Sequence, residues 1–347
     1  MQIKPSQIRL DASTVCQLKC PTCKTTSGLT ARTLGSKTLK FADFENFVAA
    51  NPWIRHIELS SQGEIFLNRD LLKIVEHAYA KKITLSAATG VNLNTVSEEM
   101  LEGLVKYQFS VITCSIDGAS RETYRIYRRG GDFEKVMENI RKINELKIQY
   151  RSVWPRLRWQ FIAFGHNEHE ILLARKMALK FGMEFYVKLA WDDFSPVKNK
   201  YLVKRISGLR AASREEYRKA YGRIYLGEKD CSQMWLQPQI NPDGRVLGCC
   251  QNHWGDYGNA FEEDLVGILN NEKMNYARAM LLGKEKERDD IPCTRCPLYK
   301  EMKRSQRWLF SRGKDPCDPA QNRPLLNDKM TIENNRSLPI FIAGDTL

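Results

Sequence analysis

From residue 8 to about residue 190, short apolar runs alternate with segments in which apolar residues recur every three or four positions. The short runs are rich in β-branched residues and predict strands, whereas the wider spacing with charged opposite faces predicts amphipathic helices. We expect strands at residues 8–13, 56–60, 83–88, 110–116, 158–164 and 185–190. We expect helices at residues 71–80, 98–107, 133–146 and 168–181.

Strands that alternate with helices predict repeated β/α units and a parallel sheet. The six units in this pattern are too few for a closed eight-stranded barrel. The expected fold class is therefore α/β, with an open partial (β/α)6 TIM barrel whose ligands bind at the carboxyl ends of the strands. We place this barrel at residues 1–195, a linker helix at 196–230, a small auxiliary domain at 231–310 and a tail at 311–347.

The composition indicates an intracellular protein with metal centres. The 347 residues include no apolar stretch near the about 20 that span a bilayer, and no secretory signal, so we expect a cytoplasmic chain without a membrane partner. Ten cysteines in tight groups predict metal ligands in a reducing compartment, without disulfides. The net charge of +13 would suit an acidic flavodoxin or ferredoxin electron donor, an anionic substrate or nucleic acid, although a solvated basic surface needs no partner.

The most specific motif is Cys16-x3-Cys20-x2-Cys23 near the N-terminus. Three thiolates leave one iron of a four-iron cluster without a protein ligand, and a small molecule can coordinate there. Zinc is the alternative, but it requires a fourth ligand, and no further His or Cys follows in this loop.

This motif resembles that of the radical S-adenosylmethionine (radical SAM) superfamily. The resemblance implies a [4Fe-4S] cluster whose open iron is chelated by SAM. One electron from the cluster then cleaves SAM to methionine and a 5'-deoxyadenosyl radical, which abstracts a hydrogen atom from the substrate.

The resemblance extends to residues at the predicted strand ends, which imply contacts to SAM. Gln62-Gly63-Glu64 resembles the family's GGE motif, in which glycine admits close backbone approach and Glu64 can fix the amino group of SAM. An arginine before a Gly pair reaches the SAM carboxylate in the family, and Arg128 is our first choice and Arg129 our second. The remaining implied contacts are Ser115 and Asp117 after the fourth strand, and Ile162 and Asn167 near the adenine.

A second cysteine group lies in the C-terminal part. Cys231 and Cys249-Cys250 flank a predicted β-hairpin with strands at 234–240 and 245–247 and a turn at 241–244. A hairpin brings its ends together, so Cys231, one of the adjacent pair, and the later Cys293 and Cys296 can supply four thiolates. We take Cys249 as the ligand, although the sequence alone does not separate it from Cys250. Tetrahedral zinc on four cysteines is the alternative.

This part resembles the SPASM and twitch extensions of radical SAM enzymes, with a β-hairpin and a helix around 274–282. The resemblance implies one auxiliary [4Fe-4S] cluster, which is the shorter twitch form. The spacing is similar to that of 2-deoxy-scyllo-inosamine dehydrogenases, and sulfatase-maturating enzymes are related members.

A closed auxiliary cluster can accept an electron, which favours oxidation of the substrate radical. Asp192 and Asp193, just past the sixth predicted strand, are candidate catalytic residues that take a proton or hold the substrate. If a thiol returns hydrogen instead, the product is an epimer, with Cys114, Cys250 or Cys317 as donor.

Only fifteen residues precede Cys16, which leaves no room for a leader-binding segment and shifts the expectation towards a small polar substrate such as a carbohydrate, aminocyclitol or nucleotide-sugar. The main alternative is a peptide or protein maturase that forms thioethers or formylglycine. A further alternative is RNA modification, prompted by basic residues at 204–223. Their helical spacing with Glu215 and Glu216 favours a solvated helix over a nucleic-acid surface. A zinc-stapled binding module is the non-enzymatic alternative.

Overall fold

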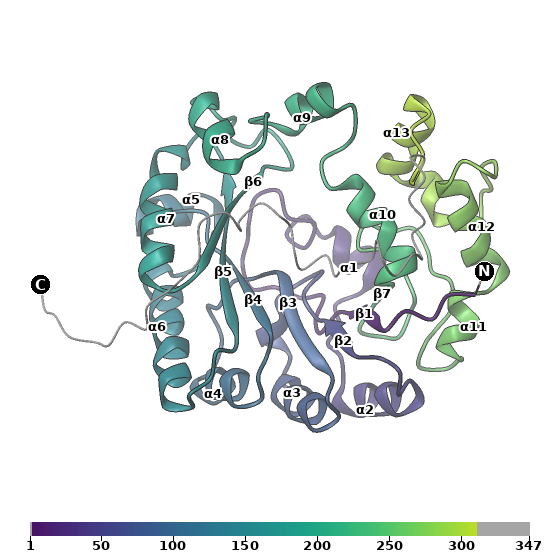
Figure 1. Cartoon of the computed structure of the whole chain (residues 1–347), viewed down its shortest axis with the longest axis horizontal. Coiled ribbons are helices and arrows are strands. Elements are labelled where there is room, and N and C mark those ends of the chain that lie inside the picture. The colour runs from purple at the N-terminus through teal and green to yellow at the C-terminus, as the bar shows by residue number, and fades with distance from the viewer. Residues whose placement is uncertain (1, 311–347) are drawn as a thin grey trace, which may run out of the picture.

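The computed structural model describes residues 2–310, so the tail and Cys317 lie outside the described residues. Seven parallel strands form one sheet in the order β6-β5-β4-β3-β2-β1-β7 (Figure 1). The sheet stays open between its edges β6 and β7, as expected for a partial barrel. The strands are β1 (Gln7–Leu10), β2 (His56–Glu58), β3 (Thr84–Val91), β4 (Val111–Ser115), β5 (Arg156–Ala163), β6 (Glu184–Leu189) and β7 (Gln239–Ile240).

Helices cover the outside of this sheet. In Figure 1, α2, α3, α4, α6 and α7 follow its outer side, whereas α10 to α13 gather beside β7. Apolar positions on one face explain the packing: the long helix α6 buries a stripe that runs from Phe133 to Leu146. The barrel helices are α1 (Leu29–Leu34), α2 (Phe41–Ala50), α3 (Leu71–Ala80), α4 (Glu98–Lys106), α5 (Arg121–Tyr127), α6 (Phe133–Gln149) and α7 (Ile171–Lys180).

The first six strands confirm the β/α pattern, and the four expected helices are present as α3, α4, α6 and α7. Central strand β4 is buried at every position, as a strand covered on both faces must be. Helix α7 begins later than expected because residues Glu168–Glu170 form a 3-10 turn. Within the described residues, no helix has the length and apolar character needed to cross a membrane.

Residues 196–230 contain several helices where one linker helix was expected. They hold α8 (Lys200–Ser207), α9 (Arg214–Tyr221) and the start of α10 (Gly227–Leu236). Gly208 and Gly222 adopt left-handed conformations directly after α8 and α9, which ends each helix.

The predicted hairpin is wrong in its first strand. Helix α10 continues to Leu236, and only β7 remains of the expected strand at 234–240. The reason is helical spacing, since Cys231 and Met234 are three residues apart and line one cavity together. The turn is correct, because Ile240 and Val246 form an antiparallel bridge across it. The expected strand at 245–247 is reduced to isolated bridges.

The C-terminal part is joined to the barrel by backbone pairing. Strand β7 lies parallel to β1, with Leu10 opposite Ile240, so the auxiliary part extends the barrel sheet. Asn270 also holds the backbone of Ile3 through two hydrogen bonds of 2.7 and 2.8 Å. The helices here are α11 (Leu265–Leu269), α12 (Glu272–Leu281) and α13 (Pro297–Ser305), and α12 confirms the helix expected around 274–282.

Candidate active site

The three motif cysteines lie in the loop between β1 and α1. Cys20 is buried, and Cys16 and Cys23 are half-buried. They pack against apolar side chains of the same loop, of α5 and of the ends of β5 and β6. These side chains are Leu18, Tyr127, Ile162, Phe164, Ala190 and Phe194. Such a shell excludes water from a cluster held by these thiols.

Two polar side chains reach the sulfur atoms. Arg128 Nη1 donates to Cys20 Sγ at 3.8 Å, and Asn92 Nδ2 donates to Cys16 Sγ at 3.8 Å. Burial raises the pKa of Cys16 to about 11 and also raises the pKa of Cys20. Metal binding must therefore release protons, and the two donors stabilise the resulting thiolates. Asn92 was missed by the sequence analysis, although it follows the end of β3, where ligands of a parallel sheet gather.

The loop after β2 presses against the cysteine loop. Gly63 has φ +54°, and a Cβ there would lie 2.6 Å from the carbonyl oxygens of Ser13 and Val15, so only glycine fits. Glu64 N donates to Val15 O at 2.7 Å, which fixes the two loops together. Gln62 Nε2 donates to Cys250 O at 3.1 Å and so links this loop to the auxiliary part.

The Glu64 carboxylate is buried and committed to the backbone. It accepts from Asn92 N at 2.6 Å and from Phe66 N at 3.3 Å. Burial raises the pKa of Glu64 to about 7 against these hydrogen bonds, which lower it. The carboxylate therefore organises the strand-end loops, and its expected contact with an amino group of SAM stays a prediction.

Four of the other predicted SAM contacts are brought together at the ends of β4 and β5. Arg128 Nε donates to Asp117 Oδ2 at 2.6 Å, and Ile162 N donates to Asp117 Oδ1 at 2.7 Å. Asn167 Nδ2 donates to the carbonyls of Asp117 and Ile162 at 3.1 and 2.9 Å. Burial raises the pKa of Asp117, while the Arg128 guanidinium lowers it. The side chain of Asn167 thus braces this corner, and Arg128 joins it to the cysteine loop.

The remaining predicted residues differ in their placement. Ser115 is buried and accepts from Gln160 Nε2 at 3.5 Å. Arg129 is exposed, its Nε donates to Ile126 O at 3.4 Å and its guanidinium lies 5.9 Å from the Phe194 ring centroid. Arg128 instead bonds both Asp117 and Cys20 and is the better placed arginine. Asp192 and Asp193 are also exposed, and Asp192 Oδ1 accepts from Phe194 N at 2.9 Å within its own turn.

The second cysteine group surrounds a cavity in the auxiliary part. Four thiols line it, from Cys231 on α10, Cys249 after the turn, and Cys293 and Cys296 before α13. The rest of the lining is mainly apolar and includes Met234, Leu247, Trp254, Leu281, Leu298 and Tyr299. Burial raises the pKa of Cys231 and Cys249 well above the usual thiol range, and neighbouring thiols raise it further. Four sulfur donors in an apolar shell fit a cluster with every iron ligated.

Cys250 points elsewhere. Gln233 Nε2 donates to Cys250 Sγ at 3.5 Å, and Cys250 N donates to Gln233 Oε1 at 2.8 Å. Its charged surroundings include Asp230 and Arg9. Cys250 is therefore held toward the barrel, and Cys249 is the member of the pair that lines the cavity.

The other thiols do not join either group. All nine cysteines of the described residues are free thiols. Cys114 is fully buried within β4, and burial raises its pKa. Among residues 2–310, no set of three or more His, Cys, Asp or Glu side chains is grouped as a site for a single metal ion.

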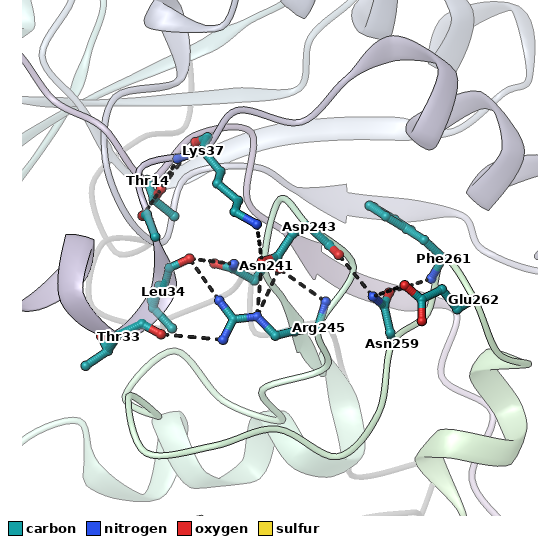
Figure 2. A network of polar contacts seen from close by, with 11 residues as sticks. Thr14, Thr33, Leu34, Lys37, Asn241, Asp243, Arg245, Asn259, Phe261 and Glu262 are labelled. Carbon is teal, nitrogen blue, oxygen red and sulfur yellow. Dashed lines mark hydrogen bonds and ion pairs between the residues drawn. The ribbon is translucent and has the colours of Figure 1, made fainter.

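A polar network holds the auxiliary turn against the segment that follows the cysteine loop (Figure 2). Arg245 Nη2 and Asn241 Nδ2 donate to Leu34 O at 2.9 and 3.0 Å. Lys37 Nζ lies 3.1 Å from Asp243 Oδ2. Because Leu34 is the last residue of α1, Arg245 satisfies a carbonyl that the helix leaves open. The network therefore fixes the two cysteine groups relative to one another.

Two parts of the chain match known families. Residues 12–170 match the Radical SAM superfamily, and residues 231–297 match SPASM, an iron-sulfur cluster-binding domain. The first match contains the three-cysteine loop, and the second contains all four thiols of the auxiliary cavity.

One curated relative is the GTP 3',8-cyclase of Desulforamulus reducens, which is 27% identical over 146 residues. The aligned part is 41% of this chain and 43% of the relative, so the match spans less than half of the relative's length.

Solved structures share the fold at low identity. SuiB of Streptococcus suis has a TM-score of 0.60 at 15% identity, covering 85% of this chain and 71% of SuiB. The enzyme anSMEcpe with bound AdoMet and Cp18Cys peptide has a TM-score of 0.56 at 16% identity, covering 86% of this chain and 87% of that one. Identity this low establishes the common fold alone.

Proposed function

The chain is a radical SAM protein with a SPASM iron-sulfur domain, and from that premise we propose that it is an oxidoreductase that removes hydrogen from a small polar substrate. When bound, a [4Fe-4S] cluster and SAM together supply a 5'-deoxyadenosyl radical, which takes a hydrogen atom from the substrate. The residues of this chain bind and orient the reactants and decide what becomes of the substrate afterwards.

We assign the first cluster to Cys16, Cys20 and Cys23, and the SAM carboxylate to Arg128. Arg128 uses Nε for Asp117 and Nη1 for Cys20, and its Nη2 donates no hydrogen bond to the described residues. A guanidinium fixed in this way is preorganised to donate to a carboxylate beside the cysteine loop.

The observation that carries the substrate assignment is the polar character of the sheet face beside the cysteine loop. Side chains two residues apart share a face, so Gln160 lies on the side of Ile162, which packs with Cys20. Gln160 and Ile162 are in register with Tyr186 and Lys188 of β6. Tyr186 Oη donates to Gln160 Oε1 at 2.9 Å. Hydroxyl, amide and ammonium groups on one face suit a hydroxylated or charged small molecule better than an apolar one.

The substrate radical has two possible fates, oxidation and epimerisation, and Cys250 bears on the second. A substrate carbon that has lost one hydrogen becomes a carbonyl if it also gives up a hydroxyl proton to a base and one electron to an acceptor, which would be a cluster held by Cys231, Cys249, Cys293 and Cys296. Alternatively, it takes a hydrogen atom from a thiol and becomes the epimer, and the sulfur is then restored by one electron from the reductant and one proton. Cys250 is a thiol outside the auxiliary cavity, held beside Gln62 of the loop after β2, so we assign it the donor role in the second outcome.

For the first outcome we keep Asp192 and Asp193 as the candidate proton acceptors. Both are exposed at the end of β6, and Asp192 lies within electrostatic reach of Arg214.

The second candidate function is peptide or protein maturation. One solved structure of SuiB is bound to the precursor peptide SuiA, and that of anSMEcpe carries the Cp18Cys peptide. These likenesses favour a peptide substrate, whereas the polar face between β5 and β6 favours a small molecule.

A fractionation experiment separates the two candidates. The protein, purified without oxygen and reduced with dithionite, is given SAM in deuterated water together with either the small-molecule or the peptide fraction of a cell extract. We expect the small-molecule fraction to raise 5'-deoxyadenosine formation and one of its components to lose two hydrogens or to gain one deuterium. Stimulation by the peptide fraction alone would replace the first proposal by the second.

The Cys250→Ser variant then separates the two outcomes. Loss of deuterium incorporation with retained 5'-deoxyadenosine formation identifies epimerisation. A product two hydrogens lighter that forms equally in this variant identifies oxidation.

A further inference from the structure

We propose that Lys188 and Arg214 form a binding site for an anionic group of the substrate, a carboxylate or a phosphate. The inference rests on the proposed function, because it names the chemical class of the molecule that binds beside the cysteine loop. The two side chains come from β6 and α9, and they are 26 positions apart in the sequence.

Lys188 is a cation on the inner face of the sheet, and residues 2–310 offer it no ion-pair partner. Its neighbours in β6, Val187 and Leu189, are buried on the opposite face, so Lys188 points to the side of Ile162. It is half-buried, and its Nζ makes no hydrogen bond or ion pair within the described residues. Burial, together with the charges of Lys229 and Arg214, lowers the pKa of Lys188 to about 8. Burying a charged ammonium group without a partner costs free energy, so such a lysine is rare in a strand unless a ligand pairs with its charge.

Arg214 is held by two hydrogen bonds and two aromatic rings, and one of its guanidinium nitrogens has no acceptor within the described residues. Its Nε donates to Ala190 O at 2.8 Å and its Nη1 to Tyr225 O at 3.4 Å. The guanidinium carbon lies 3.4 Å from the ring centroid of Trp191 and 4.8 Å from that of Tyr225. Its Nη2 is buried and has no hydrogen-bond partner among the residues that the structure describes. A buried guanidinium nitrogen without an acceptor is unfavourable, and an anionic ligand would supply the acceptor.

The pair lies beside the cysteine loop. Ala190, whose carbonyl accepts from Arg214, packs with the apolar shell of Cys16, Cys20 and Cys23. An anion bound here therefore places the rest of a small molecule next to the site where hydrogen is removed.

The nearby carboxylates form no ion pair with Lys188 or Arg214 within residues 2–310, although Asp230 acts on both cations through its charge. Asp230 raises the pKa of Lys188 through its charge, but its Oδ2 accepts from Gln251 Nε2 at 3.0 Å. Asp192, which acts on Arg214, is exposed and accepts from a backbone N–H of its own turn. Asp117 is paired with Arg128. Each of the three acids accepts a hydrogen bond elsewhere, whereas Lys188 Nζ and Arg214 Nη2 have no partner in the described part of the chain.

The test measures affinity for anionic and neutral probes of one size. The full-length protein with its clusters reconstituted and SAM bound is titrated by calorimetry with D-glucuronate, D-glucose 6-phosphate and D-glucose at millimolar concentrations. We expect at least one of the two anions to bind, with the preferred one identifying carboxylate or phosphate, and glucose to bind at least about tenfold more weakly. Lys188→Met and Arg214→Gln should each weaken the anion about tenfold, and Lys188→Arg should restore most of the loss.

Lys198→Met and Arg210→Gln are the matched controls, since both side chains are exposed in neighbouring segments. The inference is overturned if neither anion binds, if glucose binds as well as the anions, or if Lys188→Met and Arg214→Gln bind the anion like the controls. It is also overturned if these two variants lose affinity for SAM and not for the anion, since the charges would then serve SAM. Formation of 5'-deoxyadenosine by the wild-type protein without any probe tests the proposed function separately, so the two failures are distinguishable.

Discussion

Adjacent residues in this protein have separate tasks, as Cys249 and Cys250 illustrate. The Cys249 thiol lines the auxiliary cavity with three other thiols. The side-chain amide of Gln233 instead bonds both the sulfur and the backbone N–H of Cys250. The direction in which each thiol points therefore determines its chemistry, although the two cysteines are adjacent in the sequence.

This difference gives a matched pair of variants. We expect wild-type protein to carry about eight irons if both clusters are four-iron cubanes. Cys249→Ser should lose about half of that iron, because a cluster ligand is removed, and Cys250→Ser should retain all of it. Iron analysis after anaerobic reconstitution measures both, and equal losses in the two variants would contradict the assignment.

Arg128 acts through the forked shape of its guanidinium as well as through its positive charge. Arg128→Lys keeps the positive charge but removes the fork that joins Asp117, Cys20 and the assigned SAM carboxylate. We expect SAM affinity to fall about tenfold, since charge-assisted hydrogen bonds contribute about 1.5–3 kcal/mol. Equilibrium dialysis with labelled SAM measures the loss, with the exposed Arg129→Lys as control. Equal affinities in the two variants would show that the fork is not used.

Asp11 gives a prediction about pH. It is buried in the barrel, its Oδ2 has no hydrogen-bond partner within the described residues, and burial raises its pKa to about 7. The folded protein therefore binds this proton more tightly than the unfolded chain, and the stabilisation is lost as pH rises toward 7. Thermal unfolding of wild type and Asp11→Asn between about pH 5 and 8 should show a steeper decline for wild type. Parallel profiles would mean that Asp11 does not titrate in this window.

At the scale of elements, the loops at the strand ends are positioned by contacts that tolerate little change. Gly63→Ala would place a methyl group 2.6 Å from two carbonyl oxygens of the cysteine loop. We expect destabilisation of about 1–3 kcal/mol and a weaker first cluster, because the strain falls on its ligand loop. Chemical unfolding and the iron content measure the two effects, with Gly182→Ala as the control, since that glycine also has a positive φ but open space around it. Equal effects at both glycines would assign the loss to backbone strain alone.

The elements also show what the sequence could and could not predict. The six barrel strands follow from alternation, and the two cysteine groups follow from spacing. The extent of helix α10 was missed because the apolar run that begins at Met234 is short enough to fit a strand, whereas packing places Met234 beside Cys231 on one helix face. The pairing of Lys188 with Arg214 joins different elements, so no local pattern contains it.

At the scale of the whole molecule, the auxiliary part is a continuation of the barrel sheet. Strand β7 pairs with β1, and the network around Arg245 and Asp243 fastens the turn to the end of α1. The two cysteine groups are thus fixed in one frame, which suits electron transfer between them. The division of the chain at residues 195 and 230 stays a prediction.

The net charge of +13 supports our expectation of an acidic electron donor such as flavodoxin or ferredoxin. Reduction of the protein by flavodoxin should then slow as salt is added, because salt screens the attraction between the two surfaces. At about 0.1 M salt this attraction is largely screened beyond about 10 Å. Stopped-flow absorbance measures this rate, and a rate that does not depend on salt would exclude steering by charge.

We propose that Cys16, Cys20 and Cys23 hold a cluster with one iron open to SAM. Electron paramagnetic resonance of the reduced Cys249→Ala variant isolates this cluster, and Cys16→Ala serves as the blank. We predict that adding SAM shifts the g-values of the signal. A spectrum that SAM leaves unchanged would show that no iron of this cluster is open to SAM.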